Sequence, residues 1–209
     1  MYKGAGVSLQ PQAHIASAPP KPVAHMAMMI RPTHAVTLDA SRVEALHMIA
    51  AAHRAGLSRL KVAQTRTAPG VVAKILPDGY AAAPHGAPAA VQEAIWAANR
   101  LIGFPYVYGG GHGTFYASGY DCSGTVSFAL HGGDLLTAPM DSSEFYAFGD
   151  AGRGRWITVY TNPGHAFLEI AGIRLDTSTA GQTDGEQGPR WRPLLADTSS
   201  YEARHPAGY

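Results

Sequence analysis

The chain has a single cysteine, Cys122, in the segment Gly119-Tyr-Asp-Cys-Ser-Gly124, just before an expected helix. Backbone N–H groups and the positive dipole end at a helix start favour a thiolate, which is the form of cysteine that attacks. The same N–H groups can bind the oxyanion that forms when a carbonyl is attacked. The position of Cys122 just before a helix therefore predicts that this cysteine is a nucleophile. The alternative is a helix cap beside a buried cysteine that packs as a small hydrophobic residue.

A cysteine nucleophile needs a base that takes its proton and returns it to the departing amine. Among ten histidines, His165 directly precedes the alternating segment Ala166–Ile170, and Ala171-Gly172 has the form of a two-residue hairpin turn. His112 lies in a glycine-rich loop and His131 lies further along the helix that Cys122 begins. Neither is expected to aim its imidazole at the thiol, so His165 is the predicted base.

The expected hairpin places Glu169 opposite Arg174, a favourable cross-strand pair of opposite charge. Alternation then puts His165 and Asp176 on one face of the sheet, within side-chain reach of each other. An aspartate there can orient the imidazole and stabilise its charged form, which is the third role in a catalytic triad. Two alternatives stay open: Asp176 as a turn cap, and Asn162 as the orienting residue.

The elements that must position these residues are predicted from apolar periodicity. Helical spacing predicts a helix from Pro88 to Gly103 and a second from Ser123 to Leu130. A period of two predicts strands over Trp156–Tyr160, Ala166–Ile170 and Ile173–Thr177. Helices followed by an antiparallel sheet predict an α+β domain over residues 88–209.

The N-terminal part has a different pattern. Residues 1–36 are rich in Pro and Ala and are expected to form a flexible arm. Residues 37–87 are expected to hold a helix of unknown role at Ser41–Gly56, which starts with a capping box, and a short strand within Val71–Leu76. Three prolines and two glycines between Pro77 and Pro88 predict a linker or a turn-rich segment.

Composition excludes several classes of function. Of the 209 residues, 46% are hydrophobic and 15% charged, which indicates a packed core. A net charge of +1 without a basic cluster argues against nucleic acid binding. The apolar patch at Ala24–Ile30 is too short for a membrane span and poorly placed for a signal peptide. One cysteine makes a disulfide framework or a Cys-based zinc site implausible, so no metal and no cofactor are expected. The oligomeric state is not predicted.

Three segments in this order resemble the NlpC-type cell-wall cysteine peptidases over roughly residues 88–209. They are Phe104-Pro-Tyr-Val-Tyr-Gly-Gly110, Asp121-Cys-Ser-Gly-Thr-Val126 and Gly164-His-Ala-Phe-Leu-Glu-Ile170. The resemblance implies a papain-like fold, in which a helix carrying the cysteine packs on an antiparallel sheet carrying the histidine. It also implies hydrolysis of peptidoglycan stem peptides, commonly after γ-linked D-glutamate, and an extracellular or cell-wall location.

Carried over by motif, the resemblance implies that Cys122 is the nucleophile, His165 the base and Asp176 the third residue. It places Tyr106 beside the nucleophile, where its hydroxyl would help to hold the oxyanion; ordinary aromatic packing is the alternative. The implied substrate-binding residues are Asp121, which would bind the substrate amine, Ser123 and Tyr108. The chain departs from the family where Asp176 stands in place of the usual His and Tyr108 in place of the usual Trp.

Two other functions remain open on the sequence. The same fold could serve a thiol acyltransferase or amidase that acts on a lipid or another small amide. It could also serve a wall-binding module without catalysis, although the Cys, His and Tyr set argues against a decayed site. The pH dependence of thiol labelling would separate a catalytic cysteine from an inert one.

Overall fold

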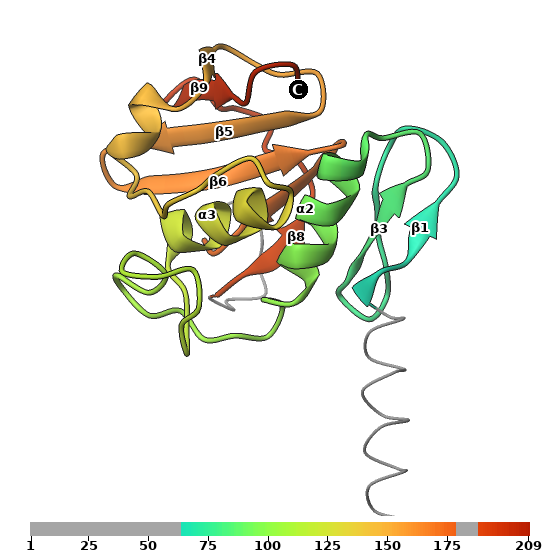
Figure 1. Cartoon of the computed structure of the whole chain (residues 1–209), viewed down its shortest axis with the longest axis horizontal. Coiled ribbons are helices and arrows are strands. Elements are labelled where there is room, and N and C mark those ends of the chain that lie inside the picture. Colours follow the sequence, from blue (N-terminus) through green and yellow to red (C-terminus); the bar gives the residue numbers. More distant parts are fainter. Residues whose placement is uncertain (1–63, 179–187) are drawn as a thin grey trace, which may run out of the picture. The chain divides into compact units, whose positions relative to one another are not determined.

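The computed structural model describes residues 64–178 and 188–209 (Figure 1). The expected arm over residues 1–36 and the expected helix Ser41–Gly56 lie outside the described residues. The described helices are α2 (Ala89–Asn99), α3 (Cys122–Gly132) and the short 3₁₀ helix η1 (Glu144–Ala147). The strands are β1 (Thr67–Ala68), β2 (Lys74–Ile75), β3 (Ala81–Pro84), β4 (Asp150–Ala151), β5 (Ile157–Asn162), β6 (His165–Ile170), β7 (Ile173–Asp176), β8 (Arg190–Arg192) and β9 (Glu202–His205).

Helices and an antiparallel sheet form one core. The main sheet has six strands in the order β4-β9-β5-β6-β7-β8, and every neighbouring pair is antiparallel. Helix α3 packs against β6 and β7, and α2 packs against α3 (Figure 1). Alternate strand residues face this core, among them Val159, Leu168 and Leu175, which are fully buried. The α+β prediction is confirmed.

Both helices of the main unit occur where apolar spacing predicts them. Pro88 is the N-cap of α2 rather than its first helical residue, and the helix ends at Asn99, one turn before the positive-φ residue Gly103. At the far end of α3, a side chain on Gly132 would clash with Ala97, and one on Gly133 would clash with the Ala90 carbonyl. These two glycines therefore let α3 pack closely on α2.

A second, three-stranded sheet, in the order β1-β3-β2, stands where a linker was expected. The prediction of a turn-rich segment was wrong for Ala81–Pro84, which forms the fully buried strand β3 beside α2. The three alanines of β3 show no alternation of apolar and polar residues from which a strand could be predicted. The strand is buried because helix α2 covers it. The predicted strand at Val71–Leu76 is reduced to Lys74–Ile75. The start of the catalytic domain at residue 88 stays a prediction.

The buried amide of Asn99 joins β3 to α2 and β8. Its Oδ1 accepts hydrogen bonds from the Ala81 N–H (2.8 Å) and from the Trp191 indole (2.7 Å). Its Nδ2 donates to the carbonyls of Ala81 (2.8 Å) and Gln64 (2.7 Å). One side chain thus satisfies four polar groups from three other segments of the chain.

The hairpin of β6 and β7 has the register that the sequence predicts. Glu169 is paired with Arg174, and both turn residues, Ala171 and Gly172, have positive φ, as a tight two-residue hairpin requires. Glu169 also forms an ion pair with Arg153, which lies between β4 and β5, at 3.1 Å. Within the described ranges, no helix is both long and apolar enough to cross a membrane.

Replacing Asn99 by Ala should destabilise the fold, because it leaves the buried Ala81 and Trp191 groups without partners. We expect the free energy of unfolding to fall by about 2–4 kcal/mol, measured by urea denaturation. Gln92→Ala is the matched control on the same helix. Its amide makes one hydrogen bond, to the Ala87 carbonyl, and its loss should cost about 1 kcal/mol or less. Equal losses in the two variants would contradict the role given to Asn99.

Candidate active site

Cys122 is the first residue of α3, and Asp121 is the N-cap. The Asp121 backbone is extended, and its Oδ1 accepts a hydrogen bond from the Gly124 N–H at 2.8 Å. This is the ordinary way for an aspartate to start a helix. The thiol is largely buried, with Cys122 9% exposed, and lies at the positive end of the helix dipole, as the sequence predicts.

His165 and Asp176 come together at one edge of the hairpin. His165 is the first residue of β6 and Asp176 the last residue of β7, and Nε2 of the imidazole lies 2.8 Å from Oδ1 of the carboxylate. Asp176 is buried and also accepts hydrogen bonds from the Ser178 N–H (2.8 Å) and hydroxyl (2.9 Å). The hairpin register therefore fixes the orientation of the imidazole.

The imidazole of His165 lies close enough to the thiol of Cys122 for each group to shift the pKa of the other. Because Asp176 engages Nε2, Nδ1 is the ring nitrogen left to face the sulfur. Burial raises the pKa of Cys122, but the hydrogen bonds from His165 and from the Ala166 N–H, together with the charge of His165, bring that pKa below its ordinary value. The thiol is thus set to ionise more readily than a free cysteine.

The pKa of His165 moves in the opposite direction. Burial lowers it, but the hydrogen bonds to Asp176 and Cys122 and the charges of both residues raise it to about 9. For Asp176, burial raises the pKa, and the hydrogen bond and charge of His165 outweigh burial and hold that pKa below its ordinary range. Together these shifts favour a thiolate beside an imidazolium, with the aspartate ionised.

A buried arginine stands behind Asp176. Arg174, 1% exposed, places Nη1 3.3 Å from Oδ2 of Asp176, whereas His165 contacts Oδ1, the other oxygen of the carboxylate. Charges thus alternate along this part of the sheet from Glu169 through Arg174 and Asp176 to His165. Such an arrangement keeps the carboxylate ionised although it is buried.

Tyr106 lies close enough to the nucleophile to sense its charge. Burial raises the pKa of Tyr106, and the negative charges of Cys122 and Asp121 raise it further. Its side chain is 39% exposed, so it lines the surface and is not a core residue. Tyr108, in the same loop, is 91% exposed, and its role in substrate binding stays a prediction.

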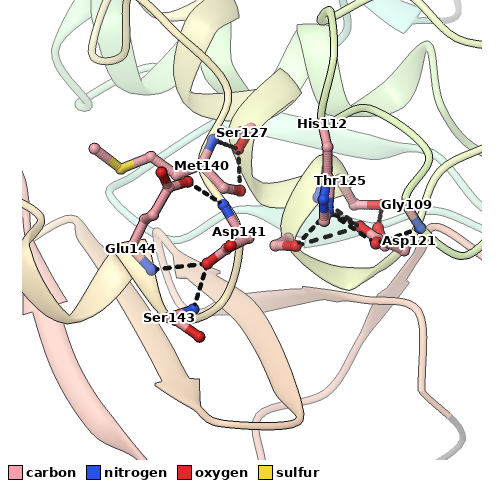
Figure 2. Close-up of polar contacts among 11 residues, drawn as sticks. Gly109, His112, Asp121, Thr125, Ser127, Met140, Asp141, Ser143 and Glu144 are labelled. Atoms are coloured by element: carbon pink, nitrogen blue, oxygen red, sulfur yellow. Dashed lines mark hydrogen bonds and ion pairs between the residues drawn. The ribbon is translucent and has the colours of Figure 1, made fainter.

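Asp121 and Ser123, the other predicted substrate-binding residues, are both buried and bonded to their own surroundings. Figure 2 shows Asp121 with its partners Gly109 and His112. Oδ2 of Asp121 accepts from the Gly109 N–H at 2.9 Å, and Nε2 of His112 lies 2.8 Å from the same oxygen and 2.9 Å from Oγ of Ser123. Their contact with substrate stays a prediction. The polar contacts of His112 are thus with the residues on both sides of Cys122.

Sequence reasoning missed Tyr201, which precedes β9. Its ring makes an edge contact with Phe167 (centroids 5.0 Å apart) and a looser one with His165 (6.4 Å). Burial, followed by the charge of Asp176, raises its pKa, and a hydrogen bond to Asn162 opposes that rise. No motif marked this residue, because it reaches the site only through the pairing of β9 with β5. Asn162, the alternative orienting residue, accepts a hydrogen bond from the Gly164 N–H at 3.0 Å, while Asp176 holds the imidazole.

Within the part of the chain that the structure describes, no group of three His, Cys, Asp or Glu side chains could hold a metal ion. The thiol of Cys122, the imidazole of His165 and the carboxylate of Asp176 lie next to one another in this order. Such an arrangement can support nucleophilic catalysis, with a base beside the thiol and a carboxylate that orients the base.

Comparisons with known proteins leave the family open. No family model matches the chain, and no curated protein matches it. Among solved structures, the chain is similar to the peptidoglycan hydrolase RipB from Mycobacterium tuberculosis, with 23% sequence identity and a TM-score of 0.44. The similarity covers 57% of this chain and 66% of that chain. The functional assignment therefore depends on the geometry of the site.

The site predicts a cysteine that reacts with iodoacetamide well below the pH at which a free thiol reacts. The apparent pKa from alkylation rate against pH should lie below about 8.5 in the wild type. It should rise in His165→Ala, because the hydrogen bond and the positive charge are lost. His85→Ala is the control, since His85 is exposed and bonds Thr67. A thiol that is inert, or equally reactive in His165→Ala, would contradict the pairing.

Proposed function

We propose that this protein is a cysteine peptidase that hydrolyses amide bonds in peptidoglycan stem peptides through an acyl-enzyme. The observation that carries the proposal is the order of contacts in the site. Cys122 at a helix start lies close enough to His165 for the imidazole to lower the pKa of the thiol, and Nε2 of His165 is 2.8 Å from the buried Asp176. A thiol, a base and an orienting carboxylate in this order suit acyl transfer.

In the proposed reaction, the Cys122 thiolate attacks the carbonyl carbon of the scissile amide. Backbone N–H groups at the start of α3, with the Tyr106 hydroxyl, stabilise the oxyanion. The imidazolium of His165 gives its proton to the departing amine as the C–N bond breaks, and a thioester remains. Neutral His165 then takes a proton from water, the hydroxide adds to the thioester, and the C–S bond breaks. This releases the acid and restores the ion pair.

The choice of peptidoglycan as substrate is supported by motif order rather than by the triad, which many hydrolases share. Three segments, ending at Gly110, Val126 and Ile170, resemble those of NlpC-type cell-wall peptidases. Two of them supply the nucleophile and the base, and the third supplies Tyr106 beside the thiol. Cleavage after γ-linked D-glutamate and action in the cell wall are parts of the same proposal.

Incubation with purified sacculi, or with a stem tetrapeptide, followed by mass measurement of the fragments, tests the proposal. Cys122→Ala should lose at least about 10³-fold in rate, because no nucleophile remains. Tyr106→Phe should lose about 10-fold to 10²-fold if its hydroxyl binds the oxyanion, while Tyr146→Phe in η1 should match the wild type.

Equal product from wild type and Cys122→Ala would sink the proposal. Intact stem peptides, together with Cys122-dependent transfer of an acyl group to another acceptor, would favour the acyltransferase alternative instead.

The pH dependence of hydrolysis should be bell-shaped. Its alkaline limb should lie near pH 9, where His165 loses the proton that the departing amine needs. Its acidic limb should lie below the ordinary thiol pKa, since that of Cys122 is lowered. Asp176→Asn should move the alkaline limb to lower pH, because the hydrogen bond and charge of Asp176 raise the pKa of His165. An alkaline limb that stays in place in Asp176→Asn would contradict this role.

A further inference from the structure

The carboxylate of Asp121 joins two segments that meet around the nucleophile. Its Oδ1 accepts from the Gly124 N–H in the first turn of α3 at 2.8 Å. Its Oδ2 accepts from the Gly109 N–H at the start of the glycine-rich loop at 2.9 Å. With Asp121 3% exposed, this negative charge is buried one residue away from Cys122 in the chain.

The ring of His112 closes the same network from the loop side (Figure 2). Its Nε2 lies 2.8 Å from Oδ2 and 3.0 Å from Oδ1 of Asp121, and 2.9 Å from Oγ of Ser123. An ionised carboxylate only accepts hydrogen bonds, so Nε2 must carry the hydrogen and donate. The Ser123 hydroxyl also donates to Oδ1 of Asp121, at 3.3 Å. One imidazole thus binds the residues before and after the nucleophile.

The loop backbone lies directly on the start of α3. The Asp121 N–H donates to the Gly110 carbonyl at 3.2 Å, and a side chain on Gly124 would clash with that same carbonyl. A side chain on Gly111 would meet the Gly124 backbone. The side-chain bonds of His112 add to this contact between glycine backbones and hold the loop at residue 112 against the first turn of α3.

The charge of Asp121 works against the ionised sulfur. Burial is the main effect that raises the pKa of Cys122, and the negative charge of Asp121 adds to it, whereas His165 and the Ala166 N–H lower it. The other ionisable groups near the sulfur are Tyr106 and Tyr201. A hydrogen-bond donor on the Asp121 carboxylate draws the negative charge of that carboxylate toward itself. It therefore reduces the repulsion between the carboxylate and the Cys122 thiolate.

We propose that His112 is a positioning residue of this site: through Asp121 and Ser123 it ties the glycine-rich loop to the first turn of α3 and offsets the Asp121 charge beside the Cys122 sulfur. The inference rests on the proposed function, since it gives the residue a part in preparing the nucleophile. His112 acts through Asp121 and does not itself exchange protons with the thiol, which is the role of His165.

Iodoacetamide labelling of the full chain against pH tests the proposal without any substrate. At pH 6, His112→Ala should react about threefold to tenfold more slowly than wild type, because the Asp121 carboxylate loses one of its hydrogen-bond donors and its charge then raises the thiol pKa further. His112→Gln, which keeps an N–H donor, should return the rate to within about twofold of wild type. His85→Ala should match the wild type, and thermal unfolding of each variant checks that it is folded.

Asp121→Asn provides a test that leaves His112 in place. Asparagine can still cap α3 but carries no charge, so alkylation at pH 6 should be faster than in the wild type. The proposal is overturned if Asp121→Asn reacts no faster, if the His112→Ala profile coincides with that of the wild type, or if His112→Gln behaves as His112→Ala does. Failure of the wild type to cleave peptidoglycan would sink the proposed function alone, since labelling needs no substrate.

Discussion

The approach of the His165 imidazole to the Cys122 thiol is the constraint on which the rest of the site depends. The thiol belongs to the start of a helix and the imidazole to the start of a strand, so the two groups meet only if α3 packs tightly on β6. Small residues also let other segments approach α3 closely: Gly124 lies against the Gly110 carbonyl of the loop, and Gly132 lies against Ala97 of α2. The packing of α3 on the sheet therefore sets the distance between the Cys122 thiol and the His165 imidazole.

Two aspartates act on this pair in opposite directions. Asp176 accepts from His165 and stabilises the imidazolium, while Asp121 lies next to the thiolate and opposes it. Both carboxylates are buried, and a further polar side chain contacts each of them. Arg174 stands behind Asp176, and His112 binds Asp121. How readily Cys122 ionises in this largely buried site thus depends on how the surrounding charges are distributed.

Where sequence reasoning failed, the missing information was tertiary. Ala81–Pro84 forms a buried strand because α2 covers it and Asn99 satisfies its backbone, and neither fact is visible in three alanines and a proline. Tyr201 joins the site from a segment far along the chain. The sequence does not predict His112 as a site residue, because its place in a glycine-rich loop does not aim the ring at the thiol, and its bonds to Asp121 appear only once the loop is folded.

The sequence by itself determined what local spacing encodes: the helix that starts at Cys122, the alternating strands, and the hairpin register that sets His165 against Asp176. These features follow from backbone geometry over a few residues, so pattern alone predicts them. Only the tertiary structure decided that the imidazole meets the sulfur, and which buried charges surround them. Those outcomes depend on packing between segments distant in sequence, and no local period records such packing.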